Sequence, residues 1–350
     1  ANVEKIVKAA QDEFAAKGNV VVIDKSPYTL EGTSENVRTK ETNLGNLIAD
    51  ALYNSTKFDH ESDFAVTNGG GIRTTLNKDL PVTVGDIIKV MPFGNQLTQI
   101  QVKGSDVKKM YEHSLRALIN EKDGKEELDA QGKPQLGSNG GFLQSSSSIK
   151  VVFDPHRKAG DRVLSIHVLN KKTGEFEPLD PNRTYYVATN DFLAVGGDGY
   201  TMLGGAREEG PSMDEAFKNY LEKADLTKYA VVNPNSRTIS VDSKTYKFET
   251  EKPETPRNEV PKGETAQDAP VLSKEELVVT RHIDASGNEL APVELGDKEP
   301  KVLKGYNTVS TSKKDGIITH VYGVEKVGVK SGEKASVANN ERNLPNTGMN

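Results

Sequence analysis

The chain has 350 residues, a formal net charge of −6 and a hydrophobic content of only 35%. The negative charge gives no general attraction to nucleic-acid phosphates, so we expect no nucleic-acid partner. The absence of cysteine excludes disulfides, thiolate metal ligands and a cysteine nucleophile, and no apolar run reaches the ~18 residues that a membrane span needs.

Residues 1–248 predict one α+β domain in which a mixed sheet is layered with helices. Two early segments have apolar residues at helical spacing and predict amphipathic helices: Val3, Ile6, Val7, Ala10 and Phe14 in the first, and Leu44, Leu47, Ile48, Ala51 and Leu52 in the second. Gly18 is placed to end the first of them as a C-cap.

Strand-like runs of apolar and β-branched residues follow at 64–66, 98–102, 149–153, 164–168 and 185–189. A helix is predicted to begin at Gly104-Ser105. Ser212 with Glu215 three residues later is a capping-box signature for another helix. Because strands and helices interleave irregularly, a mixed sheet is favoured over a doubly wound parallel one.

A glycine-rich segment, Asn68-Gly69-Gly70-Gly71-Ile72-Arg73, follows the strand-like run 64–66. Its glycines would leave backbone N–H groups exposed for an anion or a polar ring edge, and Arg73 offers a planar fork of donors. The alternative is a mobile loop with a surface arginine. Arg38, just before the second helix, is open to the same pair of interpretations: a ligand-binding arginine or a solvated charge.

The segment from Asn190 to Tyr200 carries the most ligand-binding chemistry. Phe192 could stack on a flat ring, Gly197 would allow a close backbone approach, and Asp198 could accept hydrogen bonds from a diol. The alternative is a glycine-rich turn whose aspartate bonds its own backbone. Phe142 lies in a loop of glycines and serines without obvious core neighbours, which favours binding over a role as a hydrophobic anchor.

Together these segments resemble the C-terminal substrate-binding domain of the 5'-nucleotidase family, which also contains UDP-sugar hydrolases. The resemblance runs in order through residues 42–52, 67–73, 86–104 with its Met91-Pro92-Phe93-Gly94, 142–163 and 190–200. It implies that Phe142 and Phe192 sandwich a nucleobase and that Asp198 bonds the ribose hydroxyls. It further implies that the nucleotide, expected to be AMP or adenosine, is held by Arg38, Asn68, Arg73 and Gly197.

The resemblance also implies what this chain lacks. In the family, hydrolysis is carried out by a pair of divalent metals (Zn, Mn or similar) in an N-terminal metallophosphoesterase domain, with motifs such as Gly-Asn-His-Glu. No such motif occurs here, and the six histidines are scattered. His113, on a predicted helix, is interpreted as structural or solvated. Ala1 also suggests an excised fragment, so we expect nucleotide binding without hydrolysis, no cofactor in this chain and a partner metal domain.

The C-terminal part changes character at 249–275, where four prolines among polar residues predict an extended linker. Residues 276–325 recover strand texture, with an Asp315-Gly316 hairpin signal, and predict a small all-β module faintly similar to mucin-binding-type surface repeats. Residues 326–350 predict a polar spacer. Its Leu344-Pro345-Asn346-Thr347-Gly348 resembles the LPxTG sorting signal, which implies sortase attachment of Thr347 to peptidoglycan on a Gram-positive cell surface.

Two interpretations remain open. The first is the substrate-binding half of a secreted, wall-anchored 5'-nucleotidase, in which a domain rotation brings the bound nucleotide to the metals. The second is a surface adhesin or immune-evasion module that binds a host protein. Within the enzyme class, the binding half of a 2',3'-cyclic-nucleotide phosphodiesterase/3'-nucleotidase is the alternative. Such enzymes tend to carry tyrosines at the stacking positions, so the phenylalanines favour the 5'-nucleotidase branch.

Overall fold

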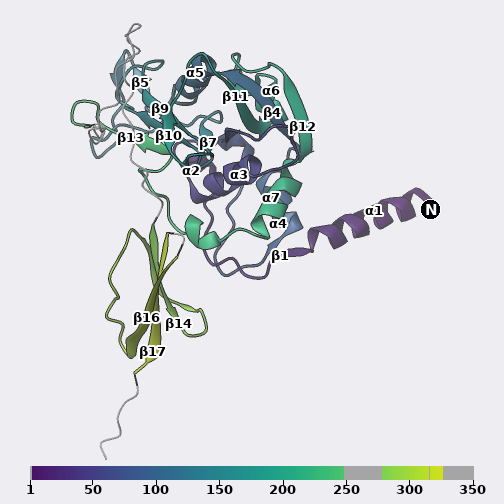
Figure 1. Cartoon of the computed structure of the whole chain (residues 1–350). Coiled ribbons are helices and arrows are strands. Elements are labelled where there is room, and N and C mark those ends of the chain that lie inside the picture. Colours follow the sequence, from purple (N-terminus) through teal and green to yellow (C-terminus); the bar gives the residue numbers. More distant parts are fainter. Residues whose placement is uncertain (1, 248–277, 315, 326–350) are drawn as a thin grey trace, which may run out of the picture.

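The computed structural model describes residues 2–247, 278–314 and 316–325. They form an α+β domain and, after it, a small all-β module (Figure 1). The fold class predicted from the sequence is confirmed, because the sheets of the domain are mixed and helices layer them. Within this described part, no helix is long and apolar enough to cross a membrane.

The central sheet of the domain has five strands. In spatial order they are β12 (Arg207–Ser212), β4 (Gln96–Lys103), β11 (Thr184–Asn190), β2 (Phe64–Asn68) and β7 (Leu143–Ser145). Strands β11 and β2 are parallel, and the other neighbours are antiparallel. The parallel pair therefore ends at one edge of the sheet, where Asn68 and Asn190 are the last strand residues.

Both faces of this sheet are buried. In β2, Phe64 and Val66 pack into one hydrophobic cluster and Ala65 packs into another. Successive side chains of a strand point to opposite faces, so the two clusters lie on opposite sides of the sheet. A continuous apolar run, as at 64–66, is what a strand covered on both faces requires.

Three helices form one covering layer: α3 (Asn43–Tyr53), α4 (Val84–Val90) and α7 (Met213–Leu221). The other face packs against helix α5 (Gly104–Ser114) and a second mixed sheet. The strand order of that second sheet is β10 (Phe176–Pro178), β9 (Val163–Leu169), β8 (Ile149–Phe153) and β13 (Thr238–Ser240).

Local polar contacts set where the helices begin. The Thr42 hydroxyl accepts a bond from Gly45 N at the start of α3, and Thr83 forms a capping box with Asp86 at the start of α4. The capping box predicted at Ser212 and Glu215 is wrong, because the Ser212 side chain makes no cap bond. The helix predicted after it is confirmed as α7: Ser212 is the N-cap residue of that helix and also the last residue of β12, paired with Gln96 of β4.

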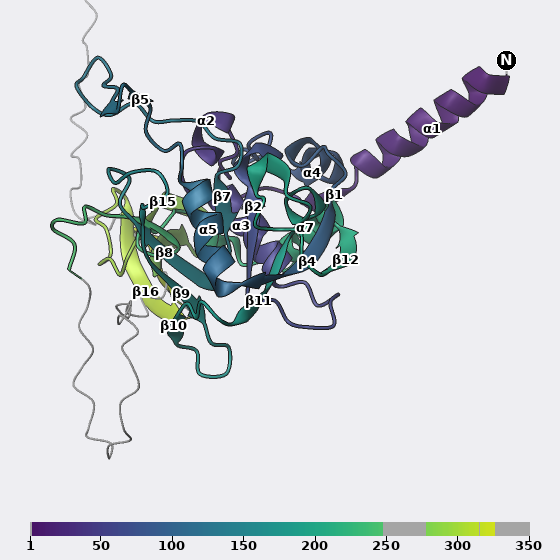
Figure 2. The ribbon, with the colours of Figure 1, turned by 90° about the horizontal axis from the view of Figure 1, so that it is seen from above.

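Helix α1 (Asn2–Gly18) projects away from the domain (Figures 1 and 2). The predicted helix is confirmed, but its apolar stripe is exposed, with Val3 73% and Ile6 68% accessible. The remaining short elements are β1 (Val21–Ile23), α2 (Ser34–Val37), η1 (Gly69–Gly71), β3 (Val82–Thr83), β5 (Glu121–Lys122), β6 (Lys125–Glu126), α6 (Asp191–Ala194), η2 (Gly197–Gly199) and η3 (Leu226–Tyr229).

The β-module has four strands in the spatial order β15 (Glu289–Leu295), β14 (Val279–Asp284), β17 (Ile317–Val324) and β16 (Tyr306–Lys314). Strands β16 and β17 pair antiparallel on either side of the predicted Asp315-Gly316 turn, in which Asp315 lies outside the described residues. The interior of the β-module includes His282, whose ring nitrogens bond the Tyr322 hydroxyl (2.7 Å) and the Glu294 carboxylate (2.8 Å).

Candidate functional site

A cavity of about 410 Å³ opens where β2 and β11 end. Five of the residues predicted from the sequence to bind a ligand line it: Arg38, Asn68, Arg73, Phe192 and Asp198. Its other lining residues are Gly70, Gly71, Phe93, Asn95 and Gly140. All belong to the α+β domain, and they come from segments that are far apart in the sequence.

The glycine-rich segment after β2 forms the floor of this cavity by close backbone approach. Gly69 N donates to Phe142 O (2.7 Å) and Gly70 N to Gly140 O (2.8 Å). A Cβ added at Gly69 would lie 2.0 Å from Val37 O, so a side chain cannot be accommodated there. The prediction that these glycines leave N–H groups exposed for a ligand is therefore wrong for Gly69 and Gly70, whose N–H groups bond the neighbouring loop.

A chain of side-chain bonds fixes the carboxylate of Asp198. Asn190 Nδ2 donates to Asn68 Oδ1 (2.9 Å), and Asn68 Nδ2 donates to Asp198 Oδ2 (3.2 Å). On the other side, the His113 ring donates from Nε2 to Asp198 O (2.7 Å), which makes His113 structural as predicted. The strand-end asparagines therefore aim the aspartate toward the cavity.

Two partly exposed phenylalanines share the cavity. Phe192, on α6, is 42% exposed, and Phe93, in the turn after α4, is 57% exposed. Gly197 does not line the cavity, but a Cβ there would lie 2.5 Å from Phe192 O and 2.6 Å from its ring, so this glycine makes room for the aromatic residue. Aromatic rings left open to water in a concave site are suited to stacking on a flat ligand.

Phe142 does not lie where we predicted. Its side chain is only 2% exposed and packs in the hydrophobic cluster between the two sheets, so it cannot face Phe192 across an open slot. The prediction of that pair is wrong, because the β2–β7 pairing places residue 142 beneath the glycine loop. Phe93 is the aromatic residue that the sequence reasoning missed. Its signal was an aromatic side chain between Pro92 and Gly94, in a turn.

The two arginines bring positive charge to the cavity. Arg38 caps the C-terminal end of α2, and its Nε is buried without a partner among the described residues. Arg73 stacks on Phe93, with its guanidinium carbon 5.4 Å from the ring centroid. Arg38 and Arg73 outnumber the single lining carboxylate of Asp198, so the cavity favours an anion although the chain as a whole is negative.

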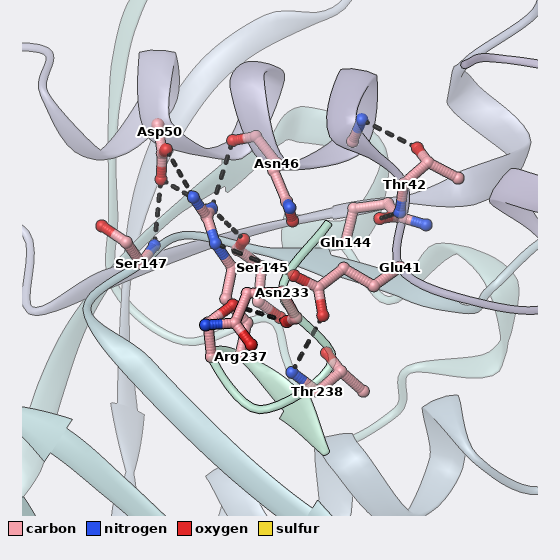
Figure 3. A network of polar contacts seen from close by, with 12 residues as sticks. Glu41, Thr42, Asn46, Asp50, Gln144, Ser145, Ser147, Asn233, Arg237 and Thr238 are labelled. Carbon is pink, nitrogen blue, oxygen red and sulfur yellow. Dashed lines mark hydrogen bonds and ion pairs between the residues drawn. The ribbon is translucent and has the colours of Figure 1, made fainter. Parts of the chain in front are cut away.

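A buried polar network underlies this end of the domain (Figure 3). Arg237 binds both carboxylate oxygens of Asp50 at 2.8 Å and also donates to Ser145 O (2.9 Å), which ties α3 to β7. Burial would lower the pKa of Arg237, but the adjacent Asp50 more than offsets this and raises it. Burial raises the pKa of Glu41, although Arg237 Nε lies 3.9 Å away.

Two further predictions, on metal ligands and on the sorting motif, concern residues outside this cavity. Among the described residues there is no group of three or more His, Asp or Glu side chains that could hold a metal ion. Thr347 and the rest of the sorting motif lie outside the described residues.

One known protein family matches most of the α+β domain. The family described as 5'-nucleotidase, C-terminal domain, matches residues 20–205. This chain belongs to that family. The match takes in all the lining residues of the cavity, from Arg38 to Asp198. Residues 278–323 separately match the SSSPR-51 domain family, over the strands of the β-module.

Individual relatives are similar to between about half and two thirds of the chain. It is 35% identical over 199 residues to a trifunctional nucleotide phosphoesterase of Bacillus subtilis, covering 56% of this chain and 12% of that protein. A snake venom 5'-nucleotidase of Crotalus adamanteus is 36% identical over 194 residues, covering 52% and 30%. The 5'-nucleotidase precursor of Thermus thermophilus superposes with a TM-score of 0.53 at 32% identity, covering 69% and 43%. The chain thus spans less than half the length of each.

Proposed function

We propose that this chain is the nucleotide-binding and specificity domain of a 5'-nucleotidase, and that it holds the base between Phe93 and Phe192. The observation that carries this proposal is the pair of exposed phenylalanines in one cavity with an aspartate and two arginines. Stacking on an aromatic side chain contributes about 1–3 kcal/mol per base and tolerates different bases.

The polar residues of the cavity have complementary parts in this proposal. Asp198, already fixed by Asn68, accepts hydrogen bonds from the ribose hydroxyls. Arg38 and Arg73 supply planar forks of donors for the phosphate and for other acceptors of the ligand. AMP has a base for the two aromatic rings, a ribose diol for Asp198 and a phosphate for the arginines. Adenosine lacks the anionic phosphate that the arginines favour.

We assign hydrolysis of extracellular nucleotides to the full-length, secreted protein. A pair of divalent metals in an N-terminal metallophosphoesterase domain would supply an activated water and offset the charge of the phosphate. The described residues offer no ligand set for such a pair. In this assignment the present chain binds and orients the nucleotide, and the isolated chain releases no phosphate from AMP in the presence of Mn²⁺ or Zn²⁺.

Calorimetric titration of AMP into the chain tests the binding proposal. Phe93→Ala and Phe192→Ala should each weaken AMP binding about fivefold to 150-fold, since each removes a stacking surface. Phe176→Ala is the matched control: this phenylalanine lies on β10 of the second sheet and does not line the cavity. Unchanged affinity in both cavity variants, or an equal loss in the control, would contradict the proposed function.

We further propose that the protein is anchored to the Gram-positive cell wall through Thr347. The support is the Leu344-Pro345-Asn346-Thr347-Gly348 sequence, which follows a polar stretch near the C-terminal end of the chain. Mass spectrometry of wall digests from cells making the full-length protein should find a mature C-terminus at Thr347 linked to peptidoglycan. A different mature C-terminus would remove the anchoring claim and leave the cavity unaffected.

A further inference from the structure

Gln144 is a buried amide that bonds three backbone groups of one loop. It lies on β7 and pairs with Thr67 of β2, the residue that precedes Asn68. Its side chain is shielded from water. Nε2 donates to Val37 O (3.0 Å) and to Lys40 O (2.8 Å), and Oε1 accepts from Thr42 N (3.1 Å). Figure 3 shows this amide beside Thr42, at the start of α3.

The loop held by Gln144 carries Arg38. Residues 38–42 connect the four-residue helix α2 to α3 and belong to no strand. Arg38 O accepts from Asn139 N (3.2 Å), and Gln144 bonds residues 37 and 40 on either side of the arginine. Gln144 alone contributes three long-range bonds, to residues 37, 40 and 42.

The packing around Gln144 leaves the loop little room to shift. A Cβ at Gly45, in the first turn of α3, would lie 2.2 Å from Gln144 Oε1. Arg237 fixes the neighbouring residues from beneath, because it donates to Ser145 O (2.9 Å) and to Asn46 O (3.3 Å). Gln144 therefore rests on a rigid base made by β7 and α3.

We propose that Gln144 is a positioning residue that holds Arg38 in the orientation the nucleotide cavity needs; this rests on the proposed nucleotide-binding function. Gln144 does not line the cavity and acts through the backbone of residues 37–42. Holding a binding group in place before the ligand arrives reduces the entropy lost on binding. The β2–β7 register then couples Arg38 to Asn68, which belongs to the same cavity.

A double-mutant cycle with AMP tests this coupling. Gln144→Met keeps the length of the side chain and removes its three hydrogen bonds. In the otherwise unaltered protein this change should lower the affinity for AMP about tenfold. In an Arg38→Ala background the same change should weaken AMP less than about twofold, because the group that it positions is already gone. Gln99→Met is the matched control. Gln99 is also a buried glutamine bonded to a backbone carbonyl, but it lies away from the cavity.

Amide hydrogen exchange gives a second readout that needs no ligand. Gln144→Met should speed exchange of the Thr42 amide, which bonds Gln144 directly, and of residues 37–41, while the interior of α3 stays protected. Equal losses of AMP affinity with and without Arg38, or unchanged exchange at 37–42, would overturn the positioning role. If the unaltered protein fails to bind AMP, the proposed function falls, and hydrogen exchange still decides whether Gln144 holds the loop.

Discussion

Asp198 adopts a left-handed backbone conformation, with φ of 56°, that residues other than glycine rarely adopt. Three neighbours keep it there: Asn68 bonds its carboxylate, His113 bonds its carbonyl, and Gly199 follows with φ of 78°. Strained conformations of this kind persist where the surroundings fix them, and they cluster at ligand sites. Asp79 and Asp123 adopt the same conformation away from the cavity, so the bonds to Asn68 and His113, rather than the backbone angle, set where the Asp198 carboxylate lies.

The diol is the group that we expect Asp198 to recognise. The unaltered protein should bind AMP about tenfold more tightly than 2'-deoxy-AMP, because a charged acceptor paired with a hydroxyl contributes about 1.5–3 kcal/mol in a half-buried site. Asp198→Ala should bind the two ligands equally well. Calorimetry with both nucleotides measures this. A variant that keeps the preference for the ribose would show that another group reads the diol.

At the scale of elements, the sequence predicted some contacts and missed others for definite reasons. The β-branched run before Asn190 and the glycines after it predicted a strand end with ligand-binding side chains, and Phe192 and Asp198 do line the cavity. Phe142 was misjudged because its burial depends on β7 pairing with β2, which is distant in the sequence. No local pattern reports that pairing, whereas turn residues around Phe93 could have indicated an exposed ring.

The bonds between Asp50 and Arg237 also could not be predicted from the sequence, because the two residues are 187 positions apart in the chain. Both side chains are at most 7% exposed. Asp50→Ala should cost about 3–5 kcal/mol of unfolding free energy, because it leaves the charge of Arg237 buried without its main partner. Asp161→Ala is the control. That aspartate pairs with Arg157 at the surface, and its loss should cost less than about 1 kcal/mol. Urea unfolding measures both; equal costs would contradict the role of burial.

We predict that His167, on β9 of the second sheet, makes the unfolding free energy of the protein depend on pH. Burial, with Lys150 nearby, lowers the pKa of His167 from 6.5 to about 4. The folded state therefore favours the neutral ring, and this stabilisation is complete above about pH 6.5 and is lost as the pH falls toward 4. Between pH 7.5 and 5, the unaltered protein should lose about 2 kcal/mol more unfolding free energy than His167→Leu. Parallel pH profiles for the two proteins would rule out a titrating His167.

At the scale of the whole molecule, the cavity and the β-module are separate features. Every lining residue lies within the segment that matches the 5'-nucleotidase C-terminal domain family, and none comes from the strands that match the SSSPR-51 domain. Nucleotide binding therefore does not explain the β-module, and its binding to a host protein stays a prediction. The family and the fold followed from ordered sequence blocks. The full set of residues that line the cavity could not be predicted from the sequence, because they come from segments far apart in the chain.

A crystal structure of this chain with AMP tests the central claim most directly. We predict that the base lies between the rings of Phe93 and Phe192, that Asp198 bonds the ribose hydroxyls, and that Arg38 or Arg73 contacts the phosphate. AMP bound elsewhere on the chain, or a cavity that stays empty at saturating AMP, would contradict the account.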